Sequence, residues 1–147
     1  MEINVYLSGE IHSDWRETII TGIKEKNLPE NIFTPVTDHP ASDDAGDILG
    51  AEDSDFWKDH KSAKVNMLRI QTGIDRADIV IVKFGEMYRQ WNAAFDAGYA
   101  IGKGKQLIVI HPDEHTHALK EIDANAMAVA QNEEQVIGIL EYVCLHK

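Results

Sequence analysis

The chain contains a single cysteine, Cys144, so it cannot form an intrachain disulfide bond. Chains without disulfides are typical of reducing compartments, and we therefore expect a cytoplasmic protein. No apolar run approaches the length that spans a membrane, and the first residues, Met1 to Asn4, lack the basic start of a signal peptide. These absences predict that the protein has no membrane partner.

Basic residues are scarce. The sequence has 14 lysines and arginines against 25 aspartates and glutamates, which gives a net charge of −11 with histidine neutral. An acidic surface repels phosphate backbones, so we expect no nucleic-acid partner, although an uncharged nucleoside is not excluded. The length of 147 residues, with 44% hydrophobic and 27% charged residues, predicts one soluble domain over residues 1–147.

Patterns that bind metals or flavin phosphates are also missing. His111, His115 and His117 are loosely spaced and no cysteine accompanies them, which argues against zinc. The acidic residues between 38 and 60 do not have the spacing of a calcium loop. Residues 8–12 lack the hydroxyl- and glycine-rich phosphate loop of a flavodoxin-like electron carrier. We therefore expect neither a metal nor a cofactor.

The most informative stretch runs from 78 to 110. The runs 79–82 and 107–110 are unbroken and apolar, as in parallel strands that are covered on both faces. Between them, residues 92–100 predict a helix made almost entirely of small or apolar residues. A helix of that kind packs closely on a sheet, yet it carries one carboxylate, Asp96.

The remaining elements complete an alternating pattern of strands and helices. Strands are also expected at 3–7, 32–36 and 126–130, and helices from Asp14, over 54–74, after residue 114 and from Asn132. Glu17 and Gln135 complete the spacing of capping boxes with Asp14 and Asn132. Pro35 places its strand at or near a sheet edge. Residues 38–60, with eight acidic residues, are expected to form a solvated, irregular loop.

This alternation predicts an α/β fold. The expected architecture is a flavodoxin-like, doubly wound, five-stranded parallel sheet of order 2-1-3-4-5, with helices on both faces. Ligands of such sheets bind beyond the carboxyl ends of the strands, where the order reverses between strands one and three. The prediction gathers four loops at one edge: 8–12, 37–39, 84–92 and 111–114.

Asp96 is the strongest candidate for chemistry. If Asn92 caps the helix, Asp96 lies one turn in, where the free amides and the helix dipole favour its ionised form. A fixed carboxylate at a small-molecule site can act as a nucleophile or stabilise an oxocarbenium-like centre. Equally, Asp96 could bond a neighbouring side chain or a helix terminus and have no chemical role.

Other residues in these loops also have two interpretations. Glu10 is either a sugar ligand or acid, or a solvated loop residue, and Arg69 pairs with the acidic loop or reaches a ligand anion. A histidine near the strand ends is a candidate general acid for a departing base. An aromatic residue there either stacks on a base or belongs to the core. The histidines concerned are His12, His39 and His111, and the aromatic residues are Phe84 and Trp91.

Several motifs resemble the nucleoside 2-deoxyribosyltransferase superfamily. Asp96-Ala97-Gly98-Tyr99-Ala100, followed by Gly102-Lys103, is similar to its E-x-G-x-A…GK signature. The segments 5–9, 78–82 and 109–114 resemble its first, third and fourth strands. The string from Phe84 to Asn92 is similar to the YtoQ-type branch, with which the resemblance covers essentially the whole chain.

The resemblance implies that a carboxylate attacks C1′ of a 2′-deoxynucleoside, the base leaves, and an acceptor base attacks the deoxyribosyl-enzyme. It places Asp96 at the nucleophile and Tyr6 beside it. Two departures stand out: aspartate is one methylene shorter than the family's glutamate, and Gln90, Asn92 and Ile70 stand where the family has sugar- and base-binding acids. The residues expected to bind a nucleoside or nucleotide substrate are Ser8, Gly9, Glu10, His12, Phe84, Gly85, Gln90, Trp91, Asn92 and His111.

Two functions follow. The first is an enzyme that transfers or hydrolyses the N-glycosidic bond of a nucleoside or nucleotide. The alternative is a catalytically inactive sensor of a nucleotide-derived ligand, which the shorter carboxylate and the missing acids favour. The resemblance also implies a homo-oligomer, because a neighbouring subunit can complete the site in that family.

Overall fold

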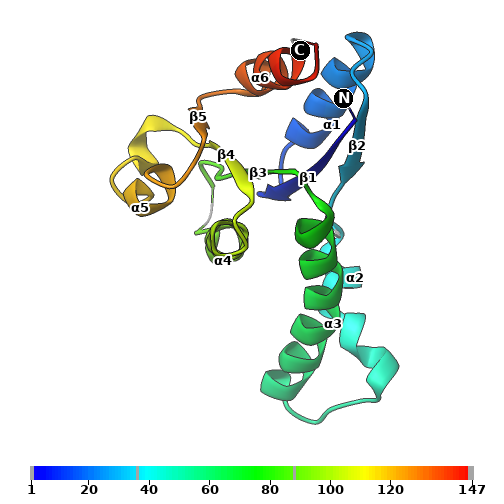
Figure 1. Ribbon diagram of the computed structural model, residues 1–147. Coiled ribbons are helices and arrows are strands. Elements are labelled where there is room, and N and C mark those ends of the chain that lie inside the picture. Colours follow the sequence, from blue (N-terminus) through cyan, green and yellow to red (C-terminus); the bar gives the residue numbers. More distant parts are fainter. Residues whose placement is uncertain (1, 36, 88, 146–147) are drawn as a thin grey trace.

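Five parallel strands form a single sheet in the computed structural model, which describes residues 2–35, 37–87 and 89–145, without the side chains of residues 30, 33 and 39. The order is β2-β1-β3-β4-β5, which confirms the predicted fold (Figure 1). The predicted strand end at Val36 and the side chain of His39 lie outside the described residues. The elements are β1 (Ile3–Gly9), α1 (Trp15–Glu25), β2 (Glu30–Phe33), α2 (His39–Asp43), η1 (Ala45–Leu49), α3 (Asp55–Arg76), β3 (Ile79–Lys83), α4 (Trp91–Gly102), β4 (Gln106–Ile110), η2 (Asp113–His115), α5 (Lys120–Asp123), β5 (Ala128–Ala130) and α6 (Glu133–Leu145).

Successive side chains of each strand point to opposite faces of the sheet, and both faces are buried. On one face, Val5 and Leu7 of β1 pack with the apolar stripes of α1 and α6. On the other, Tyr6 and Val80 pack with α3 and with the alanines of α4. The runs 79–82 of β3 and 107–110 of β4 are therefore apolar on both faces, and the even-numbered positions of β1 face the layer that carries Asp96.

The segment from 38 to 60 differs from the predicted irregular loop. It contains the short helices α2 and η1, and α3 begins at Asp55. Figure 1 shows α3 projecting well beyond the sheet, with α2 and η1 beside it as an arm. The Ser62 hydroxyl donates to the Asp43 carbonyl and accepts from the Gly46 amide, at 2.6 and 3.0 Å. The sequence pattern did not reveal this arm, because its acidic side chains are exposed and its contacts with α3 are polar. Besides the Ser62 bonds, Asp44 pairs with Lys58 and Glu52 pairs with Lys61.

The two predicted capping boxes have different outcomes. At α6 the Asn132 side chain accepts from the Gln135 amide at 3.0 Å, which confirms that cap, and the Gln135 side chain accepts from the Gln131 amide. At α1 the Asp14 side chain makes no capping hydrogen bond, so that capping box is wrong although the helix is present. The φ and ψ of Asp14, −90° and 20°, lie outside the extended region that a capping side chain needs.

Within the described ranges, no helix is both long and apolar enough to cross a membrane.

Candidate active site

Strand β1 ends in a turn that requires glycine. Gly9 has a φ of +116°, and a Cβ atom there would lie 2.1 Å from the Lys83 carbonyl oxygen. An L-residue cannot occupy this position without moving the backbone of β3. The turn ends the pairing with β3 and leaves Ser8, one residue earlier, facing α4.

The loop after β1 is held by two side chains of the first turn of α1. The guanidinium of Arg16 donates to the carbonyl oxygens of Leu7, Gly9 and Glu10 at 3.2, 3.1 and 2.6 Å. The Trp15 indole N–H donates to the same Glu10 carbonyl at 2.8 Å. Arg16 is buried, and this burial lowers its pKa from the ordinary value, although an arginine stays protonated. A fixed positive charge therefore lies beneath the carboxyl end of β1.

Asp96 lies on the buried stripe of α4. The residues that share this stripe, Ala93, Ala97 and Ala100, are small, so the helix backbone lies close to the sheet. The Ser8 hydroxyl donates to Oδ2 of Asp96, and no other hydrogen bond to the carboxylate comes from a described residue. Asp96 is 6% exposed and lines a cavity, which leaves Oδ1 as its available oxygen.

The electrostatics of Asp96 correct the expectation from helix position. Helix α4 begins at Trp91 after the N-cap residue Gln90, so Asn92 is not the cap and Asp96 lies beyond the first turn. Burial raises the pKa of the Asp96 carboxyl above its ordinary value, while the Ser8 hydrogen bond and the charge of Arg16 lower it by less. The prediction that the helix terminus favours its ionised form was therefore wrong.

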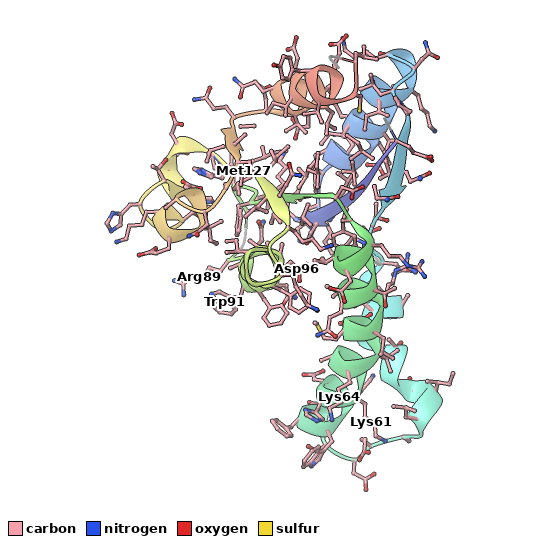
Figure 2. All side chains as sticks on the ribbon, viewed as in Figure 1. Lys61, Lys64, Arg89, Trp91, Asp96 and Met127 are labelled. Carbon is pink, nitrogen blue, oxygen red and sulfur yellow. The ribbon has the colours of Figure 1, made fainter. Side chains whose placement is uncertain are left out.

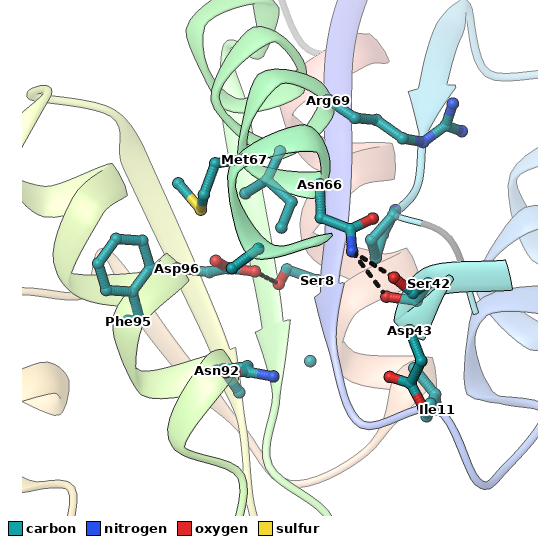
Figure 3. Close-up of a pocket in the computed structure, with 15 residues that line it drawn as sticks. Ser8, Ile11, Ser42, Asp43, Asn66, Met67, Arg69, Asn92, Phe95 and Asp96 are labelled. Carbon is teal, nitrogen blue, oxygen red and sulfur yellow. Dashed lines mark hydrogen bonds between the residues drawn. The ribbon is translucent and has the colours of Figure 1, made fainter. Parts of the chain in front are cut away.

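The cavity beside Asp96 has a volume of about 370 Å³. This lies within the roughly 300–1,000 Å³ of small-molecule sites. Figure 3 shows Asp96 and Ser8 facing it from α4 and β1, with Ser42 and Asp43 of the arm on the opposite side. The Asn66 amide donates to the carbonyl and hydroxyl oxygens of Ser42, at 2.9 and 3.0 Å, and so ties α2 to α3. The arm therefore forms one wall of the cavity.

Tyr6 is close to Asp96 but does not line the same cavity. Its ring packs on α3 at Gly73, where a Cβ atom would lie 2.5 Å from the ring carbon Cε2. Its hydroxyl is buried and has no hydrogen-bond partner among the described residues. Burial and the Asp96 carboxylate raise the pKa of Tyr6 well above its ordinary value, and the charges of Arg16 and Arg69 oppose this change. Tyr6 instead lines a groove between α3 and β2.

The other predicted site residues are divided between the Asp96 cavity and two further hollows. Ser8, Gly9 and Asn92 line the cavity of Asp96. An adjacent hollow of about 520 Å³ shares Gly9, Ile11, Asn92 and Ala93 with it. A third, of about 290 Å³, lies at the ends of β3 and β4. The adjacent hollow is also lined by Glu10, His12, Gln90 and Trp91, and the third by Glu10, His12, Phe84, Gly85 and His111.

Glu10 and Gln90 both make internal bonds that shape their loops. The Glu10 carboxylate accepts from the His12 and Ser13 amides, at 2.7 and 3.2 Å, and from the Ser13 hydroxyl. Burial opposes ionisation of Glu10, but these bonds and the nearby Lys83 charge outweigh it and lower its pKa. Gln90 accepts from the Gly85 amide at 2.7 Å and donates to the Met87 carbonyl at 2.9 Å. Both side chains therefore stabilise the loops that line the two further hollows.

Phe84 and His111 lie apart from Asp96. Phe84 belongs to the core beside α4, whereas Trp91 is 73% exposed and points outward (Figure 2). Nε2 of His111 lies 3.0 Å from the Asp123 carboxylate, and Nδ1 lies 2.8 Å from the Pro112 carbonyl. The structure therefore does not bring His111 to the Asp96 cavity. Among the described residues, no cluster of three or more histidine, cysteine or acidic side chains could hold a metal ion.

Residues 6–144 match the family described as nucleoside 2-deoxyribosyltransferase YtoQ. The chain belongs to this family. Over 144 residues the YtoQ-family chain is 43% identical to the uncharacterized protein YtoQ of Bacillus subtilis (strain 168), with 97% of each chain covered. Four of the residues predicted to form the site line one cavity in this family member: Ser8, Gly9, Asn92 and Asp96.

Two solved structures share the fold of this YtoQ-family chain. The 2-deoxyribosyltransferase of the psychrotolerant bacterium Bacillus psychrosaccharolyticus aligns with a TM-score of 0.57 and 16% identity, over 93% of this chain and 95% of its own. A conserved protein from Enterococcus faecalis V583 aligns with a TM-score of 0.64 and 14% identity, over 97% and 99%. At these identities the likeness shows the fold alone.

Proposed function

We propose that the protein cleaves or transfers the N-glycosidic bond of a nucleoside or nucleotide, with Asp96 as the nucleophile. The observation that carries the proposal is a buried carboxylate that lines a nucleoside-sized cavity at the switch point between β1 and β3. The family to which the chain belongs, described as nucleoside 2-deoxyribosyltransferase, supports this substrate class.

In the proposed reaction, Oδ1 of ionised Asp96 forms a bond to C1′ of the sugar while the C1′–N bond breaks. The electron pair of the broken bond goes to the base nitrogen, which takes up a proton. Water or the nitrogen of an acceptor base then attacks C1′ and releases the carboxylate. The Ser8 hydroxyl, bonded to Oδ2, holds the carboxylate in one orientation through both steps.

The short side chain of aspartate is compatible with this role because of its neighbours. Ala93 and Ala97 flank Asp96 on the buried stripe and keep the α4 backbone close to the sheet. Close approach of the backbone compensates for a missing methylene, since a nucleophile must lie within about 3–3.5 Å of the atom it attacks.

A second candidate function is binding without chemistry. It is favoured by the burial of Asp96, which raises the pKa of its carboxyl, and by the Ser8 bond that already occupies one of its oxygens. A sensor of this kind binds a nucleoside or nucleotide saturably and releases no base.

Chromatography of a panel of deoxynucleosides and deoxynucleotides, with and without an acceptor base, distinguishes these functions. We expect base release from the wild type, new nucleosides where the reaction is transfer, and neither from Asp96→Ala. The matched control is Asp59→Ala, which removes an exposed carboxylate of α3. Equal product from the wild type and Asp96→Ala would rule out Asp96 as the nucleophile, whereas binding without any product would establish the sensor.

We also infer that the protein is a homo-oligomer. The far end of the arm exposes large apolar side chains, with Ile48 85% and Phe56 67% exposed. Exposed apolar patches of this kind are typical of protein interfaces. Leu49 and Trp57 are exposed in the same arm, and we call these four side chains the arm-tip patch.

A further inference from the structure

A groove runs along the outer side of α3, between that helix and the edge strand β2. It has a volume of about 490 Å³. Its rim carries Arg69 and Arg76, and its floor is formed by Gly73 and Tyr6. Arg69 also lines the Asp96 cavity, so the two hollows meet at this residue. We call it the α3–β2 groove.

The two arginines on the rim are available to bind a ligand. They are seven residues apart on α3, which places them on one face of the helix, roughly 10 Å apart along its axis. Figure 3 shows Arg69 extending away from Asp96, and its only hydrogen bond to a described residue is to the Thr34 carbonyl, at 3.2 Å. Neither arginine pairs with a described carboxylate, although the chain has 25 acidic residues.

The floor of the groove is formed by the Tyr6 ring. The Tyr6 hydroxyl is buried and has no described partner, although a buried hydroxyl is unfavourable unless it forms a hydrogen bond. Gly73 has no side chain, so the Tyr6 ring lies directly against α3 between the two arginines. The ring therefore forms part of the groove floor, whereas the hydroxyl itself is enclosed and is influenced more by Asp96 and Arg16 than by Arg69.

We infer that the α3–β2 groove binds phosphate groups, with Arg69 and Arg76 as the clamp. Guanidinium groups match phosphate oxygens in geometry and charge, and two of them separated by two helical turns fit a diphosphate. The phosphate belongs either to a free anion or to a nucleotide whose nucleoside enters the Asp96 cavity beside Arg69. Binding in this groove does not depend on any reaction at Asp96.

Calorimetric titration with inorganic pyrophosphate at low ionic strength tests the site. We expect saturable binding that weakens with added salt, and an affinity at least about tenfold lower in Arg69→Gln and in Arg76→Gln. Lys64→Gln is the matched control, since it removes an exposed charge from the same helix outside the groove. Circular dichroism checks that each variant is folded.

Repeating the titration with a deoxynucleoside and its 5′-diphosphate identifies the source of the phosphate. If the nucleotide binds at least tenfold more tightly than the nucleoside, and Arg76→Gln removes the difference, the phosphate is part of the substrate. If pyrophosphate leaves the affinity for the nucleoside unchanged, the groove binds a separate anion. Absence of saturable binding by pyrophosphate and nucleotide alike, or equal affinities in Arg76→Gln and Lys64→Gln, would overturn the inference.

Discussion

At the scale of single residues, the proposed chemistry depends on opposing effects on the pKa of Asp96. Burial raises the pKa of its carboxyl, whereas the Ser8 hydrogen bond and the Arg16 charge lower it. Burial makes the carboxylate a better nucleophile once it is ionised, because it has little water to shed before it attacks. Ser8 and Arg16 therefore keep a buried acid ionisable at working pH.

Ser8→Ala tests this balance. Because the Ser8 hydroxyl lowers the pKa of Asp96, its removal should shift the acid limb of the kcat/KM profile to higher pH. We also expect a loss of roughly tenfold in kcat/KM at neutral pH, in line with the loss of one hydrogen bond to a charged group. Ser54→Ala, an exposed hydroxyl of the arm, is the control. An acid limb that stays in place would show that Ser8 does not tune Asp96.

Asp96→Asn should stabilise the fold while abolishing turnover. The pKa of Asp96 is raised in the folded state, so the ionised carboxylate destabilises the fold at neutral pH. We expect a gain of about 1 kcal/mol, or an increase in Tm of roughly 2–4 °C, by thermal denaturation at pH 7. The gain should shrink as the pH falls through the raised pKa, since the wild-type carboxyl is then protonated too. A variant that is less stable at pH 7 would contradict the assigned direction.

At the scale of elements, the strands and their order were predictable because the apolar runs of β1, β3 and β4 encode parallel strands buried on both faces. The small-residue stripe of α4 likewise placed Asp96 beside the sheet. The arm was not predictable, since its contacts with α3 are polar ones made by Ser62, Asn66 and two lysines, which leave no periodic apolar pattern.

Several residues of the site also escaped sequence analysis. Arg16 falls on the same stripe of α1 as Ile19 and Ile23, so a charge on an apolar face was the signal for it. Asn66 lies one turn before Ile70 on the side of α3 that lines the cavity. A polar residue at such a position was likewise the sequence signal for it. The direction of the pKa of Asp96 was missed because burial depends on the packing of α4, whereas the sequence showed only its distance from a helix end.

Gly73→Ala tests how closely α3 packs on β1. The added methyl group would overlap the ring of Tyr6, so either the ring or the helix must move. We expect a loss of about 1–3 kcal/mol in the free energy of unfolding, measured in urea. Gly98→Ala, in α4, is the matched control, because a Cβ atom added at Gly98 would have no neighbouring atom within 4 Å. This substitution should be neutral or slightly stabilising. Equal effects of the two substitutions would show that Tyr6 is not confined by α3.

At the scale of the whole molecule, the arm is the feature that most distinguishes this chain from a plain five-stranded α/β domain. The arm, which projects beyond the sheet in Figure 1, contributes Ser42 and Asp43 to the wall of the Asp96 cavity and carries the arm-tip patch. Sedimentation velocity should show an oligomer for the wild type and a smaller species for Phe56→Glu. Tyr142→Glu, which changes an exposed aromatic side chain of α6, is the control. A monomeric wild type at micromolar concentration would contradict this assembly.

The most direct test of the central claim is mass spectrometry of the protein after acid quenching during turnover of a 2′-deoxynucleoside. If Asp96 attacks C1′, the intact mass should rise by one deoxyribosyl group, and peptide mapping should place the added group on Asp96. Asp96→Asn should show no added mass and no released base. A deoxyribosyl group on another residue, or continued base release by Asp96→Asn, would contradict the account.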